Sequence, residues 1–224
     1  MSPEERLFLY AFVRGTKPAN VLEIGTGQGG STMVIAAALE ENNVGQVFSI
    51  DPSPRTDPHD ERYRGRLVQI PASSPEAVDK AAAIAGVPFD LALIDGIHIY
   101  KQTAKDLDAA LTHLTKRAYI LLHDSFHFGV SEAIREALAA DQGLIDCGYV
   151  CRTPRPVGDL VTHAGFRLLR RGAEVDDPAP LVQPMWESLG KPLPHDRALI
   201  NHDFWYCEAI ERCDYCKAAL VHDA

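Results

Sequence analysis

Residues 21–31 read VLEIGTGQGGS, and this stretch decides the fold class. A short apolar run ends at Ile24, a glycine-rich turn follows, and a helical pattern begins at Gly30. Glycine allows a sharp turn and a close approach to a ligand, and the next helix offers free N–H groups to an anion. Gly25, Gly27 and Gly30 also satisfy the G-x-G-x-x-G dinucleotide pattern, so the turn alone does not choose between cofactors.

Apolar runs and amphipathic runs alternate along the chain on either side of this turn. Short apolar runs predict buried strands, and the amphipathic runs between them predict helices. We expect strands at 21–26, 46–51, 66–72, 89–96, 118–124, 145–152 and 165–171, and helices at 2–15, 30–41, 74–86, 100–114 and 130–140. This order predicts a doubly wound α/β fold with a mostly parallel seven-stranded sheet that ends in an antiparallel strand pair.

The composition is that of a globular protein, and it disfavours some classes of function. The chain has 224 residues, 46% of them hydrophobic, which suffices for one core domain over 1–172. Residues 173–224 are predicted to form a Pro-rich strap and a Cys-rich helical extension. A net charge of −9 disfavours nucleic acid as a partner. We read no membrane span and no signal peptide, and the five cysteines form no secreted framework, so a cytoplasmic protein is expected.

A carboxylate follows the second strand at Asp51, where it can accept hydrogen bonds from both hydroxyls of a ribose. Together, VLEIGTGQGGS (21–31), FSIDP (48–52) and FDLALIDGIHIY (89–100) resemble the class I S-adenosylmethionine-dependent methyltransferases. The resemblance implies that S-adenosylmethionine is the cofactor. It also implies a set of cofactor-binding residues, running from the methionine part past the ribose to the adenine: Glu23, Gly25, Thr26, Gly27, Gly29, Ser31, Asp51, Ser73 and Asp95.

Two further acids, Asp95 and Asp124, end the fourth and fifth strands. If these strands are adjacent, both carboxylates could reach one hard cation such as Mg²⁺, which would lower the pKa of a substrate hydroxyl. His98 lies three residues beyond Asp95, where a neutral imidazole could act as general base. His123, Ser125 and His127 are the open candidates for a third metal ligand.

The pattern D-G-x-H-x-Y-(x)5-D (95–106), followed by LHD (122–124), resembles a subgroup of small-molecule and sugar O-methyltransferases. In that subgroup the residues matching Asp95 and Asp124 bind the cation, and the histidine matching His98 is the base. The resemblance therefore implies Asp95 and His98 as catalytic residues and a small-molecule hydroxyl as the substrate. Asp106 is predicted to be structural, paired with a nearby lysine, and Ser74 is predicted to cap the helix over 74–86.

The last part of the chain carries three of the five cysteines. Cys207, Cys213 and Cys216, with His202, could hold a structural Zn²⁺, although the spacing is not a standard zinc pattern. The alternative is an apolar helix that packs on the domain or on a second subunit, which would make a homodimer. Two other functions stay open: an NAD-dependent oxidoreductase that uses the same glycine turn, and a non-catalytic protein that binds a cofactor or a metal.

Overall fold

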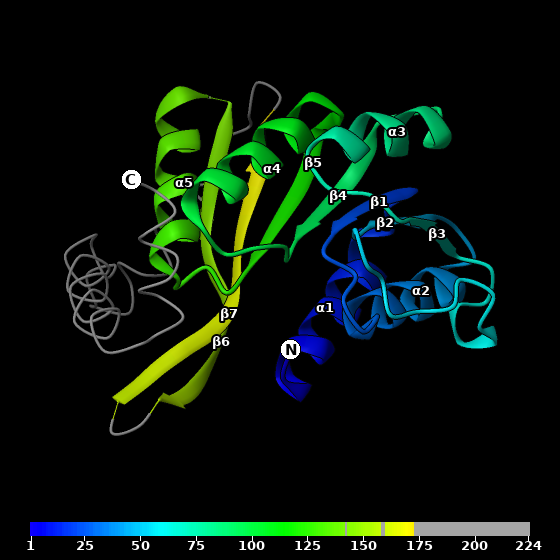
Figure 1. The fold of residues 1–224 in the computed structure, drawn as a ribbon, viewed down its shortest axis with the longest axis horizontal. Coiled ribbons are helices and arrows are strands. Elements are labelled where there is room, and N and C mark those ends of the chain that lie inside the picture. Colours follow the sequence, from blue (N-terminus) through cyan, green and yellow to red (C-terminus); the bar gives the residue numbers. More distant parts are fainter. Residues whose placement is uncertain (142, 158–159, 173–224) are drawn as a thin grey trace.

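The computed structural model describes residues 1–141, 143–157 and 160–172 (Figure 1). The predictions made for residues 173–224 lie outside the described residues. These are the strap and extension, and the Zn²⁺ site with Cys207, Cys213, Cys216 and His202. The described residues fall within the core domain that was predicted over 1–172.

One seven-stranded sheet, in the order β3-β2-β1-β4-β5-β7-β6, forms the centre of the molecule. The strands are β1 (Asn20–Ile24), β2 (Gln46–Ile50), β3 (Leu67–Ile70), β4 (Phe89–Ile94), β5 (Leu114–His123), β6 (Leu144–Val157) and β7 (Leu160–Arg171). The first five pair in parallel, and β7 runs antiparallel between β5 and β6. This confirms the predicted sheet with its terminal antiparallel pair.

Helices cover both faces of the sheet, as the alternating pattern predicts (Figure 1). They are α1 (Pro3–Thr16), α2 (Gly30–Asn42), α3 (Glu76–Ala85), α4 (Tyr100–Thr112) and α5 (Phe128–Ala140), with a short 3₁₀ turn η1 (Glu61–Tyr63). Alternate residues of β4 serve the two faces. Leu91 and Leu93 join the core under α1 and α2, whereas Ala92 and Ile94 join the core under α3, α4 and α5.

The antiparallel pair is longer than predicted. Strands β6 and β7 continue through the proline-containing segment that the sequence suggested was a link. Pro154 lies in β6, which is the edge strand of the sheet. A proline is tolerated there because the outer side of an edge strand has no neighbour that needs its missing N–H.

The start of α3 also differs from the prediction. The helix begins at Glu76 with Pro75 at the N-cap position, and Ser74 makes no capping hydrogen bond. The Ser74 hydroxyl donates instead to the carboxylate of Asp106 on α4. Both side chains line the cavity at the carboxyl ends of the strands.

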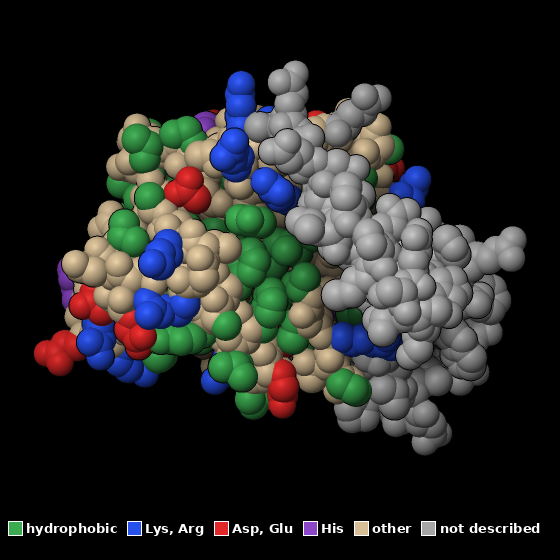
Figure 2. All heavy atoms as spheres, turned by 180° about the vertical axis from the view of Figure 1, so that it is seen from behind, with side chains coloured by type: hydrophobic (Ala, Val, Ile, Leu, Met, Phe, Trp, Pro, Cys, Tyr) green, Lys and Arg blue, Asp and Glu red, His purple; other side chains and the backbone are tan. Residues whose placement is uncertain are grey.

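Figure 2 shows the side opposite to Figure 1, where apolar side chains gather near the centre and Lys and Arg side chains lie around them. Aromatic contacts join α1 to the sheet: the ring centroids of Phe12 and Tyr119 are 5.3 Å apart, and those of Phe8 and Phe166 are 5.8 Å apart.

Among the described residues, no helix combines the length and the apolar character that crossing a membrane requires.

Candidate active site

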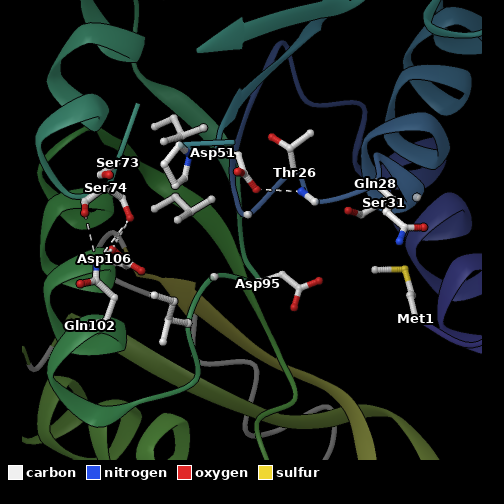
Figure 3. A pocket seen from close by; sticks show the side chains of 18 of the residues that line it. Met1, Thr26, Gln28, Ser31, Asp51, Ser73, Ser74, Asp95, Gln102 and Asp106 are labelled. Carbon is white, nitrogen blue, oxygen red and sulfur yellow. Dashed lines mark hydrogen bonds between the residues drawn. The ribbon is translucent and has the colours of Figure 1, made fainter. Parts of the chain in front are cut away.

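A cavity of about 860 Å³ opens at the carboxyl ends of the parallel strands (Figure 3). It lies where the strand order reverses between β1 and β4, the place where open α/β sheets bind ligands. Its wall contains the turn after β1, Asp51 after β2, Ser73 after β3 and Asp95 after β4. The volume falls in the usual range for small-molecule sites, roughly 300–1,000 Å³.

The glycine turn brings backbone to the edge of this cavity. Gly25 has a φ of 99°, and a Cβ there would lie 2.2 Å from the carbonyl oxygen of Asp95, so only glycine lets the turn pack against the end of β4. Gly27 lines the cavity with a φ of 51°, and a Cβ there would meet no atom within 4 Å. A ligand can therefore approach the backbone closely at Gly27.

The N-terminus of α2 follows this turn. Its N-cap residue, Gly29, makes no side-chain capping hydrogen bond, and the first turn of the helix carries no acid. Gly30 and Ser31 line the cavity, whereas Gly29 is not part of the lining. Because the first N–H groups of a helix have no partner within the helix, this end of the cavity is suited to an anionic group.

Asp51 lies at the middle of the cavity wall (Figure 3). Its Oδ2 accepts a hydrogen bond of 2.8 Å from the N–H of Gly27, and its Oδ1 accepts one of 2.7 Å from the N–H of Ser53. These two bonds hold the carboxylate in one orientation beside the glycine turn. Each oxygen keeps further lone pairs with which it can accept hydrogen bonds from a ligand.

Glu23 was predicted to contact the cofactor, but it is fully buried and is not among the residues that line the cavity. Its carboxylate accepts hydrogen bonds from the hydroxyls of Ser31 (2.5 Å), Thr32 (2.7 Å) and Ser49 (2.5 Å). Burial raises the pKa of Glu23 above its usual range. The residue therefore fixes the start of α2 from behind, and Ser31 stands between it and the cavity.

The opposite end of the cavity is formed by Ser73, Ser74, Gln102 and Asp106 (Figure 3). Asp106 was predicted to pair with a lysine. It is instead 1% exposed, and its Oδ1 accepts hydrogen bonds from Ser74 Oγ (2.7 Å) and Gln102 Nε2 (2.8 Å). Burial raises the pKa of this carboxyl group. Asp106 thus has the structural contacts that were predicted for it, with partners other than a lysine, and Gln102 was not among the predicted site residues.

Histidines and carboxylates form a cluster where β4 and β5 end side by side. His98 Nε2 lies 3.3 Å from Asp95 Oδ1, and His98 Nδ1 lies 3.7 Å from Asp124 Oδ2. Asp124 adopts a left-handed backbone conformation with φ 47°, which is uncommon for a residue other than glycine and is often found at functional sites. The two acids and His98, predicted as a group, are therefore brought together.

His123 binds to this cluster from the buried side. Its Nδ1 lies 2.8 Å from Asp95 Oδ1, and its Nε2 lies 3.3 Å from Oε1 of Glu5 on α1. Burial by itself lowers the pKa of a histidine, but the hydrogen bonds with Asp95 and Glu5 outweigh it and raise the pKa of His123 to about 10. Although burial opposes ionisation of Asp95, hydrogen bonds from His123 and His98 hold the pKa of that carboxyl well below its usual range.

Glu5 is a functional neighbour that sequence reasoning missed. It belongs to a capping box with Ser2 at the start of α1, and its side chain is fully buried. The capping signal was visible in the sequence, but the contact with His123 spans 118 positions and depends on the fold. Arg6 was missed as well, and it adds a positive side chain to the wall of the cavity near Gly30.

The donors that surround the predicted metal ligands are mainly imidazoles. Three overlapping groups in the described part of the chain have ligand atoms within 4.8 Å of one another: Asp95, His98 and His123; His98, Asp124 and His127; and Glu5, His123 and Asp124. None of the three contains both Asp95 and Asp124. Mg²⁺ prefers oxygen ligands, whereas imidazole suits transition metals, so an all-oxygen Mg²⁺ site fits this arrangement poorly.

Solved structures with the same fold include several methyltransferases. An O-methyltransferase from Bacillus cereus in complex with SAH is 18% identical, with a TM-score of 0.60 over 76% of this chain and 82% of that chain. The O-methyltransferase TomG from Streptomyces achromogenes, involved in tomaymycin synthesis and in complex with SAM, is 16% identical, with a TM-score of 0.61 over 77% and 82%. A methyltransferase from Geobacter sulfurreducens is 20% identical, with a TM-score of 0.54 over 77% and 80%.

The family comparison favours a methyltransferase over the other enzyme classes that the glycine turn left open. No curated protein matches the chain. Residues 22–125 match the model of a family described as a methyltransferase domain. The matched range contains the glycine turn, Asp51 and the ends of β4 and β5, and these parts build the cavity. With its seven-stranded sheet and this family match over residues 22–125, the chain has the fold of the class I S-adenosylmethionine-dependent methyltransferases and is similar to them in the residues that build the cavity.

Proposed function

We propose that the protein transfers a methyl group from S-adenosylmethionine to a hydroxyl oxygen of a small molecule, with His98 as the general base. The observation that carries the proposal is the place of His98. Its ring is held by Asp95, which lines the cavity, and faces Asp124 at the end of the next strand. A base at this position is next to the site where a cofactor and an acceptor would meet.

The cavity suits the three parts of the cofactor in order. Ser31, Arg6 and the uncapped N-terminus of α2 would bind the carboxylate of the methionine part. Asp51, in the middle, would accept hydrogen bonds from the ribose hydroxyls. The end at Ser73 would receive the adenine. When bound, S-adenosylmethionine supplies an electrophilic methyl group on a sulfonium.

The cluster also defines which atom of His98 would take the proton. Asp95 stays ionised, so it accepts a hydrogen bond from Nε2 of His98, and Nδ1 is left as the basic atom. In this tautomer Nδ1 removes the proton of the acceptor hydroxyl as the oxygen attacks. Asp95 then stabilises the imidazolium. The rest of the rate enhancement would come from alignment of the acceptor oxygen with the methyl carbon.

A divalent cation belongs to the proposal only as an addition to be tested. Asp95 and Asp124 remain the predicted ligands, but because imidazoles lie between them no step above passes through a metal. Turnover that survives chelation supports the histidine mechanism by itself. Turnover that is lost on chelation and then restored by Mg²⁺ or Mn²⁺, but not by Zn²⁺, supports the two carboxylates as ligands.

The experiment begins with calorimetric titration of the full chain with S-adenosylhomocysteine and, separately, with NAD. Binding of S-adenosylhomocysteine and not NAD is expected, and the reverse result would favour the oxidoreductase. A screen of phenols, sugars and other hydroxyl compounds then identifies the acceptor. With that acceptor, His98→Gln should lower kcat by about 10²–10⁴ while its affinity for S-adenosylhomocysteine stays unchanged.

The matched control is His113→Gln. His113 is a partly exposed histidine at the end of α4 that contacts Asp79 and does not line the cavity. Full activity in the His98 variant would remove His98 from the mechanism. A homodimer and a cytoplasmic location accompany the proposal as predictions made from the sequence.

A further inference from the structure

Helices cover the two faces of the sheet unequally. The core cluster on one face includes residues of α3, α4 and α5, whereas the cluster on the other face includes residues of α1 and α2. Apolar side chains gather on the side of the molecule opposite to that in Figure 1, with Lys and Arg side chains around them (Figure 2). The face with fewer helices is therefore the one expected to keep apolar side chains at its surface.

One such surface lies between α1 and β7. Tyr119 of β5 pairs with Arg170 of β7. Because side chains two residues apart on a strand share a face, Leu168 lies on the same face as these two residues. Phe12 of α1 packs edge to face on Tyr119, with ring centroids 5.3 Å apart. Phe12, Tyr119 and Leu168 contact the core under α1 and α2 but are only partly buried. We call these three residues and Arg170 the α1–β7 surface.

The side of α1 next to this surface has room for another helix. Ala11 and Gly15 lie one turn apart, beside Phe8 and Phe12, which are also one turn apart. Ala11 and Gly15 are both exposed, and a Cβ on Gly15 would meet no atom within 4 Å. Small side chains at a contact allow two helix axes to come close together.

The arginines at this surface indicate the charge of a partner. The Nε atom of Arg170 is buried and has no hydrogen-bond partner within the described residues. A buried donor without a partner is costly, and the bonds that arginine makes to a carboxylate are among the stronger hydrogen bonds of proteins. Arg117, two residues before Tyr119 in β5, is exposed on the same face. A complementary partner is therefore both apolar and acidic.

The last part of the chain has this chemistry. Residues 173–224 contain ten Asp and Glu residues against four Lys and Arg residues, and the pattern is helical from residue 198 onward. On a helix, apolar side chains at spacings of three and four would share one face: Tyr206, Ala209, Cys213, Cys216 and Leu220, with Trp205 beside them. The acids of this stretch fall outside that face: Asp203, Glu208, Glu211 and Asp214.

The same segment begins beside the α1–β7 surface. Strand β7 ends at Arg171, the neighbour of Arg170. Residues 173–197 precede the helical pattern and can span up to about 80 Å when extended, at roughly 3.3 Å per residue. Strand β7 rises only about 17 Å between Phe166 and Arg171. The chain is therefore long enough to return across the surface from which it leaves the sheet.

We propose that residues 198–221 form an amphipathic helix that packs on the α1–β7 surface of the same chain. Its apolar face covers Phe12, Tyr119 and Leu168, and one of its acids accepts a hydrogen bond from Arg170. Cys213 and Cys216 then act as small apolar residues at the contact. Because α1 also carries Glu5 and Arg6, the docked segment holds the helix that brings these two side chains to the site.

Tryptophan fluorescence of the full chain tests this docking. Both tryptophans, Trp186 and Trp205, lie in the segment, so Trp186→Phe leaves Trp205 as the only emitter. In this parent protein, Trp205 should emit at a shorter wavelength than in the same protein unfolded in urea. Its quenching by acrylamide should be several-fold weaker than in the unfolded protein.

Two further variants, each with a matched control, are made in this parent. Gly15→Glu places a long acidic side chain where the helix would lie, and its control Ala83→Glu makes an exposed change on α3, over the other face. Cys213→Asp puts a charge on the apolar face of the segment, and its control Tyr215→Asp puts one on the opposite side. Gly15→Glu and Cys213→Asp should bring the emission and the quenching of Trp205 toward their values in urea, and both controls should match the parent.

Three results would overturn the proposal. One is a Trp205 that is quenched as strongly in the folded parent as in urea. Another is a Trp205 that stays protected in Gly15→Glu, as it would if the segment folded by itself around Zn²⁺ or packed elsewhere. The third is protection that is lost on tenfold dilution together with a dimer mass in light scattering, because the segment would then cover a second copy of the chain.

Discussion

Replacing His123 by glutamine tests the buried ion cluster that joins α1 to the catalytic end of the sheet. His123 donates to Asp95 through Nδ1 and to Glu5 through Nε2, so it carries both ring protons and a positive charge. Glutamine is polar and of similar size, but it is neutral. The variant would therefore leave two carboxylates in a buried cluster without their cation.

The expected loss of stability follows from the burial of the partners. The His123 and Glu5 side chains are 4% and 0% exposed, so this pair is almost entirely removed from solvent. Removing one member of such a pair typically costs about 3–5 kcal/mol. The Asp95 side chain is 22% exposed, so water screens that contact and the two costs do not simply add. We expect His123→Gln to lower the free energy of unfolding by about 3–5 kcal/mol.

The pH dependence of this loss has a definite sign. The pKa of His123 rises on folding from 6.5 to about 10, so its contribution is complete below pH 6.5 and disappears as the pH rises through 10. The pKa values of Glu5 and Asp95 fall on folding, so their contributions are complete above their ordinary values of 4.5 and 3.8 and disappear in acid. The difference between wild type and variant should be largest between pH 4.5 and 6.5.

The assay is equilibrium unfolding in urea, repeated at pH 5.5, 7.5 and 10.5. His113→Gln is the control, because His113 contacts the exposed Asp79 and a surface contact of that kind is worth about 0–1 kcal/mol. The reasoning is refuted if His123→Gln destabilises the protein by less than about 1 kcal/mol at pH 5.5, the most that a surface pair contributes. A difference that grows with pH would refute the assigned charge of His123.

Three further changes, together with Gly65→Ala as the control for the last of them, test the cofactor cavity by calorimetry with S-adenosylhomocysteine. Asp51→Ala should weaken binding by about 10- to 100-fold, the value of hydrogen bonds to a charged acceptor, and an unchanged affinity would contradict its assignment to the ribose. Arg6→Ala should weaken binding by only about two- to fivefold, because Arg6 is exposed, and should make the affinity less sensitive to salt. Gly27→Ala and Gly65→Ala should both destabilise the fold by about 1–2 kcal/mol, since both glycines have positive φ and open space at Cβ. Only Gly27→Ala should also weaken binding, because its methyl group would enter the cavity, and equal affinities would show that the ligand does not approach this turn.

Much of the fold was predictable because its signals are local. Apolar runs of strand length and amphipathic runs of helix length alternate over residues 2–171, and the structure has strands and helices at nearly all the predicted places. The errors lie where a local signal was read in isolation. The prolines near 154–156 suggested a link, but in an edge strand they leave the sheet intact.

The acidic residues of the candidate site at the strand ends could be predicted from the sequence, whereas the contacts around them were harder to predict. Asp51 and Asp95 follow the ends of strands, and they line the cavity as expected because parallel strands end at the same edge. Glu23 lies within β1, opposite Ser49 of β2, and its side chain is directed to the buried layer under α2. The period of two along a strand decides which side a residue faces, and a one-residue difference in where the strand ends decides whether it reaches the cavity.

The sequence by itself determined the class of the fold, the glycine turn and the carboxylates at the strand ends, because each depends on residues that are close along the chain. Only the tertiary structure decided the partners of those carboxylates. Glu5 reaches His123 across 118 positions, and Ser74 reaches Asp106 across 32. Such contacts form when α1 and α4 pack against the sheet. The spacing of apolar residues along the chain does not predict these contacts. A side chain's hydrogen-bond partner depends on which groups lie near it in the folded molecule.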